Sequence, residues 1–268
     1  MRKRRFVFLM VAAAFLLFLM ISGFFCAEGA LATDFSRVDL PPSLAHLFGT
    51  DWLGRDMLLR TLRGLSISIL TGVLTAAASA VIALALGILA AQNRRADAII
   101  SYCIDMVMGI PHILLLVLIS LALGKGLRGV ALGIILTHWP SLTRVIRGEI
   151  LQLKEQPYIL TAKKLGRSNL QIAWQHILPN VLPQFLTGLI LLFPHAILHE
   201  SSVTFLGFGL SAEQPAIGII LSESMRYLIL GNWWVAVFPG LLLVVTVLLF
   251  QYAGESLKRY FDPAGAYR

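Results

Sequence analysis

Four histidines lie in or beside strongly apolar runs of this chain, and they are the side chains best suited to specific chemistry. They are His112, His138, His195 and His199, and Glu200 directly follows the last of them. An ionisable residue within an apolar span is costly, and it usually faces a bundle interior or a polar path. Neutral imidazole is a good ligand for nickel, copper and zinc. The histidines therefore raise the possibility of a transition-metal path through a helix bundle.

The spacing within "FPHAILHE" favours one particular pair. His195 and His199 are four residues apart, so on a helix both imidazoles share one face and could hold one ion. Glu200 would lie about 100° around the helix from His199. His138 is a further candidate for the path, whereas His112 has no partner at helical spacing, which predicts a smaller role for it.

Two other interpretations of these histidines compete with a metal path. Imidazoles within membranes commonly form hydrogen bonds to other helices or to the backbone. A metal-dependent hydrolase within the membrane is a remote alternative, because the His-Glu-x-x-His zinc motif needs a histidine where Val203 stands.

The elements that must position these side chains are predicted to be membrane helices. Hydrophobic residues make up 57% of the chain, only 13% of residues are charged, and the mean hydropathy is +0.80. Such a composition leaves too little polar surface for a soluble globule of 268 residues. Six runs are apolar enough to span a bilayer, which needs about 20 residues each. They are 6–26, 67–91, 99–123, 129–142, 181–198 and 233–251.

The distribution of lysine and arginine predicts the orientation of these spans. Most of these cations fall in segments that share one side of the membrane if both termini are cytosolic, in agreement with the positive-inside rule. The net charge of +8 is explained by this bias, so nucleic-acid binding is not needed. The basic start "MRKRR" and the long apolar run after it are interpreted as a first span that is not cleaved.

A polar segment, 157–180, separates the fourth and fifth runs. Pro157 can open a helix, Gly166 suits the left-handed residue that ends one, and Ser168 with Gln171 has the form of a capping box. We therefore expect two short amphipathic helices broken at Gly166, on the cytosolic side.

The stretch "TAKKLGRSNLQIAWQHILPN" resembles the cytoplasmic loop of binding-protein-dependent ABC importer permeases. Leu160 stands where the family usually has glutamate, and His176 occupies an apolar position. The resemblance implies that this loop docks on a cytosolic ATPase subunit as a coupling helix. The positions that match the family pattern are Thr161, Ala162, Gly166, Leu178 and Pro179.

Three further stretches resemble the C-type permeases of the dipeptide, oligopeptide and nickel branch. They are "FGTDWLGRDMLLRTLRG", "FLGFGL" followed by Pro215 and Gly218, and "GESLKRYFDPAGA". In the first stretch, Asp51, Arg55 and Asp56 are expected to pair with one another at a capped helix start rather than to bind cargo.

Within that branch, the histidines favour nickel. His195 and His199 resemble the His-x-x-x-His of nickel permeases, and His138 with Trp139 stands at a nickel-like place, whereas Glu200 is peptide-like. The expected function is therefore a permease subunit for nickel or a related divalent metal, free or chelated. Import of di- or oligopeptides is the alternative.

The resemblance also implies a fold and a set of partners. The fold expected is all-α, with six transmembrane helices in a type I ABC importer transmembrane domain. Residues 1–58 would form the first helix and outer loop, 59–257 the transporter domain, and 258–268 a cytosolic tail. The chain has no phosphate loop, so it is not expected to be an enzyme or to bind a cofactor. ATP and magnesium would sit on two partner ATPase subunits, beside a B-type permease and an extracytoplasmic binding protein in the inner membrane.

Overall fold

The computed structural model describes residues 2–210 and 214–261, and every regular element in these ranges is helical. The expected all-α class is confirmed. The predicted tail at 258–268 falls largely outside the described residues, as do Asp262 and Pro263. The helices are α1 (Arg2–Phe25), α2 (Met57–Ala90), α3 (Arg94–Gly109), α4 (His112–Ala122), α5 (Gly126–Lys154), α6 (Pro157–Lys164), α7 (Asn169–Ile172), α8 (Leu178–Phe205), α9 (Ile217–Leu228) and α10 (Trp234–Phe261), with the short elements η1 (Phe35–Arg37) and η2 (Ala173–Ile177).

Five of the helices are long and apolar enough to cross a membrane, and a bent pair would make a sixth span. The bent pair is α3 with α4, whose axes turn by 96°. The run expected to span the membrane at 99–123 is therefore divided into two helices by a sharp bend. Pro111 has no N–H to donate, and it holds Ile110 in an extended conformation (φ −97°, ψ 135°), so the helix ends there and restarts at a new angle.

The fourth predicted run, 129–142, lies near the start of a helix of 29 residues, which continues for a further 12 residues. Beyond the apolar run, α5 continues because its cations have partners on α3. The Arg147 guanidinium donates to both carboxylate oxygens of Asp97, and Arg144 donates to Asp105 over 2.8 Å. The hydropathy of the sequence therefore underestimated the length of α5, whose part beyond the apolar run forms ion pairs with α3.

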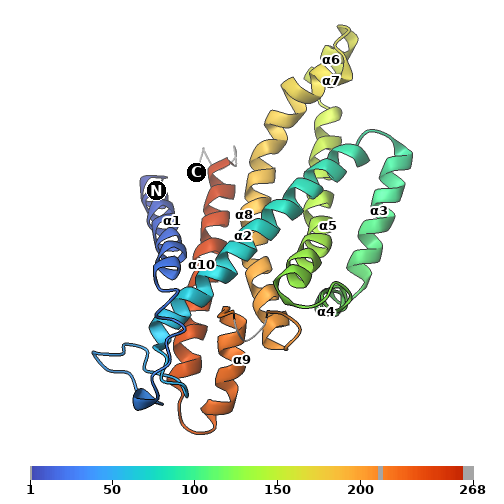
Figure 1. Ribbon diagram of the computed structural model, residues 1–268. Helices are drawn as coiled ribbons and strands as arrows, with labels where there is room; N and C mark the ends of the chain where they lie inside the picture. Colours follow the sequence, from blue (N-terminus) through green and yellow to red (C-terminus); the bar gives the residue numbers. More distant parts are fainter. Residues whose placement is uncertain (1, 211–213, 262–268) are drawn as a thin grey trace.

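The start of α1 and the end of α10 lie at the same end of the molecule as α6 and α7, while α9 and the loop between α1 and α2 lie at the opposite end (Figure 1). Small residues allow the central helices to approach closely. A Cβ added at Gly87 of α2 would lie 2.7 Å from Ile146 of α5, and one at Gly188 of α8 would lie 2.3 Å from Leu142. Close approach at glycine is the usual way in which membrane helices gain contact area.

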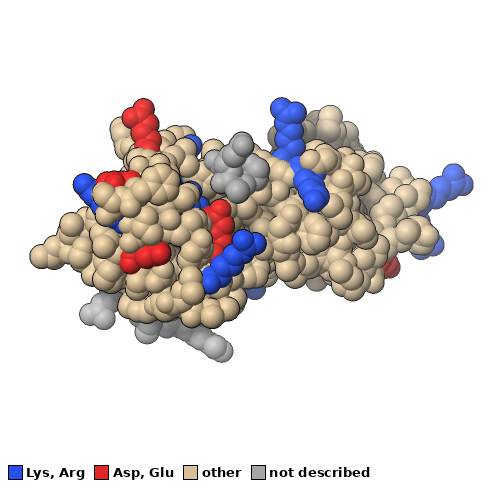
Figure 2. Space-filling view, turned by 60° about the horizontal axis from the view of Figure 1, so that its bottom comes forward, with Lys and Arg blue, Asp and Glu red and all other residues tan. Residues whose placement is uncertain are grey.

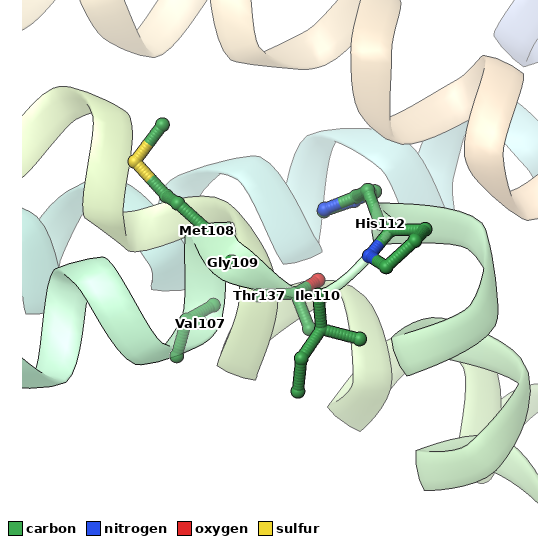
Figure 3. Close-up of a pocket in the computed structure, with 7 residues that line it drawn as sticks. Val107, Met108, Gly109, Ile110, His112 and Thr137 are labelled. Carbon is green, nitrogen blue, oxygen red and sulfur yellow. The ribbon is translucent and has the colours of Figure 1, made fainter.

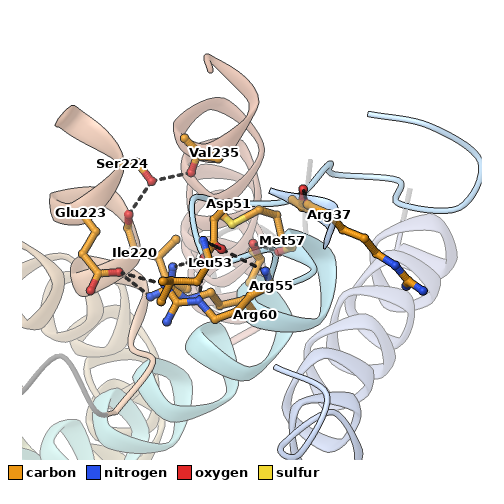
Figure 4. A network of polar contacts seen from close by, with 12 residues as sticks. Arg37, Asp51, Leu53, Arg55, Met57, Arg60, Ile220, Glu223, Ser224 and Val235 are labelled. Carbon is orange, nitrogen blue, oxygen red and sulfur yellow. Dashed lines mark hydrogen bonds and ion pairs between the residues drawn. The ribbon is translucent and has the colours of Figure 1, made fainter. Parts of the chain in front are cut away.

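A buried ion-pair network fastens the end that carries α9 (Figure 4). The Asp51 carboxylate accepts from Arg55 Nε over 2.7 Å and from Arg60 Nη1 over 3.0 Å, and Arg60 also donates to Glu223 of α9. Asp51 is fully buried and Arg60 is 1% exposed. The predicted Asp51–Arg55 pair is confirmed. Asp56, which was expected to join this pairing, instead caps α2 by accepting hydrogen bonds from the Leu58 and Leu59 N–H groups.

The loop before α2 is also tied to the start of α10. Asn232 donates to the Asp39 carboxylate over 2.7 Å, and Trp234 Nε1 donates to the Thr50 carbonyl over 3.0 Å. Burial and the nearby Asp51 charge raise the pKa of Asp39, and the Asn232 hydrogen bond opposes that shift. Figure 2, which brings this end forward, shows charged side chains scattered over a surface that is otherwise uncharged.

Candidate functional site

Three of the four histidines converge inside the bundle from three different helices. His112 opens α4, His138 lies in α5 and His199 lies in α8. One ring nitrogen of each lies within 4.8 Å of the corresponding nitrogens of the other two. The ring centroids are 4.7 Å apart for His112 and His138, 4.4 Å for His112 and His199, and 5.3 Å for His138 and His199. We call these three residues the histidine cluster.

His138 is the most buried member of the cluster, with 6% of its surface exposed. Its Nδ1 lies 3.0 Å from the carbonyl oxygen of Ile134, one turn earlier in α5. A carbonyl only accepts, so this Nδ1 carries the hydrogen, and the Nε2 of a neutral ring is left with a free lone pair. Nε2 of His138 and Nε2 of His112 are both buried and have no hydrogen-bond partner among the described residues. The cluster thus holds two unengaged nitrogens of the kind that bind metal ions.

His195 and His199 share one helix, α8, as predicted, but only His199 is among the three clustered histidines. His195 lies one turn before His199 on α8, but it is exposed and is not one of the three clustered ligands. Glu200 is fully buried, and its carboxylate accepts from Thr204 Oγ1 over 3.0 Å and from Ser201 Oγ over 3.3 Å. Ser68 of α2 is a further hydrogen-bond partner of this carboxylate, and Glu200 is not grouped with the histidines.

A cavity of about 420 Å³ opens beside the cluster, at the bend between α3 and α4. Figure 3 shows residues of the bend that line it, together with His112 and with Thr137 of α5. Thr137 immediately precedes His138, so the cavity adjoins two of the three helices that carry the cluster. Its lining consists of Val107, Met108, Gly109, Ile110, Pro111, His112 and Thr137.

Sequence reasoning missed the importance of His112, because it looked for partners at helical spacing within one helix. The useful pattern was "GIPH": the residue before a proline leaves the helical conformation, so a histidine just after the proline begins a new helix at a new angle. The resulting bend carries His112 to residues that are distant in the sequence.

The second candidate site is the polar segment 157–180, which projects beyond the other helices at the top of Figure 1. Its local structure confirms the sequence prediction. Pro157 is in the first turn of α6, Gly166 has the left-handed value φ +81°, and Ser168 and Gln171 form the capping box. A π-helical turn, η2, then leads into α8, where Pro179 cannot supply the N–H that an α-helical turn would need.

Several large apolar side chains of this segment are exposed although it lies outside the bundle. Leu165 is 79% exposed, Leu170 69% and Trp174 65%, whereas Ile159 and Ile177 are buried. Leu170 and Trp174 therefore point away from the helix bundle. Large exposed apolar patches of this kind are typical of surfaces that bind another protein.

The predicted coupling positions lie along the same segment. Thr161 is exposed on α6 and donates to the Pro157 carbonyl over 2.8 Å, and Ala162 is half-buried on α6. Gly166 forms the break between the two short helices, and Leu178 and Pro179 begin α8. The five positions are therefore spread from α6 to the start of α8.

Comparison with known proteins places the chain in a family. Residues 83–265 match the family described as "Binding-protein-dependent transport system inner membrane component". A putative peptide transport system permease protein of Brucella suis is 37% identical over 83% of this chain and 75% of the relative. The dipeptide transport system permease protein DppC of Bacillus subtilis is 31% identical over 91% of this chain and 76% of the relative.

A solved structure of the MetNI methionine ABC transporter in an inward-facing conformation shares the fold. It superposes with a TM-score of 0.63 at 21% identity, over 77% of this chain and 98% of the solved chain. The expected type I ABC importer transmembrane domain is thereby confirmed, whereas the expected nickel branch is not shown by relatives named for peptide transport. The chain belongs to the inner-membrane components of binding-protein-dependent transport systems, as an ABC importer permease of the peptide and dipeptide transport family.

Proposed function

We propose that this permease carries short peptides into the cell, and that it does so as one subunit of an ATP-driven importer. The observation that carries the proposal is the extent of the similarity. A probable D,D-dipeptide permease of Escherichia coli is 34% identical over 92% of this chain, in line with the two relatives described above. The similarity thus extends through the helices that would line the path, not only through the loop that would bind the ATPase.

The projecting segment 157–180 is the proposed contact with a cytosolic ATPase subunit. Its exposed Leu165, Leu170 and Trp174 support this role, because a protein surface would cover them better than water. The residues proposed to form or position the contact are Thr161, Ala162, Gly166, Leu178 and Pro179. The remaining proposed partners are a second, homologous B-type permease, a second ATPase subunit, and an extracytoplasmic binding protein that delivers the cargo.

The orientation proposed for this arrangement has both termini and the segment 157–180 in the cytosol. Ser36 lies in η1, before α2, and Arg95 lies in the first turn of α3, after α2; both are exposed. In a background without Cys26 and Cys103, Ser36→Cys should react with a membrane-impermeant thiol reagent applied to intact cells. Arg95→Cys should react only after the membrane is opened. Labelling of Arg95→Cys in intact cells would reverse the orientation and remove the proposed ATPase contact.

The cargo is tested by uptake in cells that carry the complete transporter and lack their own peptide and nickel importers. A radiolabelled dipeptide and radioactive nickel are supplied in parallel, and a transporter whose ATPase subunits cannot hydrolyse ATP is the control. We expect ATP-dependent accumulation of the dipeptide. Accumulation of nickel without the dipeptide would contradict the peptide proposal.

Import of nickel or a related divalent metal is the second candidate, and the histidine cluster is the observation that favours it. Three imidazoles from three helices suit a path for a transition metal, whereas a path for peptides has no need of them. Under this alternative, nickel uptake would fall severely in His199→Ala, while the complex would still assemble.

A further inference from the structure

We propose that His112, His138 and His199 form a binding site for one divalent transition-metal ion within the helix bundle. Their ligand atoms already lie within 4.8 Å of one another, although the three residues come from separate helices. A tetrahedral zinc ion with bonds of about 2.0–2.1 Å holds its nitrogen ligands about 3.3 Å apart. The three nitrogens must therefore approach one another by no more than about 1.5 Å, which imidazole rings can do by rotating about their side-chain bonds.

The protonation of His138 is already the one that a metal ligand requires. Its Nδ1–H donates to the Ile134 carbonyl, and this bond fixes the ring and leaves the Nε2 lone pair free. Metal-binding histidines almost always donate their second ring N–H to a carbonyl, carboxylate or water in this way. Only 6% of the His138 surface is exposed, and its Nε2 has no hydrogen-bond partner among the described residues. A bound ion would satisfy that nitrogen and the similarly unpartnered Nε2 of His112.

The composition of the cluster selects the class of ion. Three neutral imidazoles suit zinc, cobalt, nickel and copper, whereas magnesium and calcium prefer oxygen ligands. The one acidic residue next to the cluster in the sequence, Glu200, is hydrogen-bonded to Ser201 and Thr204 on its own helix. Three protein ligands leave a fourth position open, as in zinc sites that exchange water or substrate. The cavity at the bend between α3 and α4 would give access to that position.

The inference stands on the geometry of the cluster and does not depend on which cargo is carried. An ion in this site would join α4, α5 and α8, whether it is retained there or passes through. Failure of the dipeptide uptake experiment would therefore leave the site untouched, and absence of the site would leave peptide import untouched.

The test is a titration of the complete purified transporter with Co²⁺, followed by visible absorption, after the complex is stripped with a chelator. The affinity tag must contain no histidine. We expect one ion for each copy of this chain. Loss of a residue that hydrogen-bonds to a metal ligand weakens metal binding by about 10–100-fold. Loss of a ligand itself has a larger effect, so His199→Ala and His112→Ala should each weaken cobalt binding by at least about 100-fold.

The matched control is His195→Ala, which removes an exposed imidazole one turn from His199 and outside the cluster. Cobalt binding should be unchanged in this variant. The proposal is overturned if the wild-type complex takes up no cobalt, or if His195→Ala weakens binding as much as His199→Ala does. Should a cluster variant fail to assemble, X-ray absorption of the zinc-loaded wild type decides: three imidazole ligands support the site, and an oxygen-only shell refutes it.

Discussion

Replacing Gly166 with valine is expected to abolish transport while leaving the subunit inserted in the membrane. Gly166 has φ +81°, a left-handed conformation that is costly for residues with a Cβ and most costly for β-branched ones. It closes α6 through the hydrogen bond from Arg167 N to the Ala162 carbonyl over 3.1 Å. Valine would open this turn and change the angle between α6 and α7, so the segment could no longer fit the proposed ATPase subunit. The measurement is cargo uptake together with cargo-stimulated ATP hydrolysis by the purified complex.

Two control variants separate the backbone effect from simple bulk at this position. A Cβ at Gly166 would meet no atom within 4 Å, so Gly166→Asn should retain transport, because asparagine tolerates the left-handed conformation. Gly148 of α5 also has open space around it but lies in a regular helix, and Gly148→Val should transport normally. Normal uptake and normal stimulation in Gly166→Val would refute the coupling role of the turn.

Replacing Asp51 with asparagine is expected to destabilise the transporter by about 3 kcal/mol, as removal of one partner from a buried ion pair typically does. The change would leave the guanidinium groups of Arg55 and Arg60 in a buried environment, with Glu223 as their remaining acidic partner among the described residues. We place the cost at the lower end of the usual range because Glu223 remains. The measurement is the midpoint of thermal unfolding of the purified complex, which should fall clearly below that of the wild type.

The control for this prediction is an exposed ion pair in the same loop. Arg37 pairs with Asp34 over 3.0 Å, but their side chains are 57% and 42% exposed, so solvent screens the interaction. Asp34→Asn should leave the midpoint unchanged. Equal midpoints for Asp51→Asn and the wild type would show that the network at this end does not hold the loop, α2 and α9 together.

Local patterns predicted local structure well in this chain. The helix start at Pro157, the break at Gly166 and the capping box of Ser168 and Gln171 each depend on residues within four positions of one another, and all three are present. The apolar runs likewise identified the long helices, because burial in lipid depends on composition. Helix ends were less predictable where ion pairs on a neighbouring helix, such as Arg147 with Asp97, extended α5.

The histidine cluster could be predicted only in part, because it is a long-range feature. His138 and His199 were candidates as single residues, but helical spacing pointed to His195 as the partner, and that residue is exposed. The true third member depends on the direction in which α4 leaves Pro111. That direction is set by packing between helices, and one sequence alone contains little information about it.

The continuity of α8 has a mechanical consequence. This single helix of 28 residues begins within the projecting segment, at Leu178, and carries His199 near its other end. A displacement of the projecting segment would therefore be transmitted to the interior of the bundle along one continuous helix. Pro183 and Pro194 each remove a backbone hydrogen bond from α8, so the helix would bend most easily at these two positions. The stiffness of α8 at these prolines determines how far His199 moves when the projecting segment is displaced.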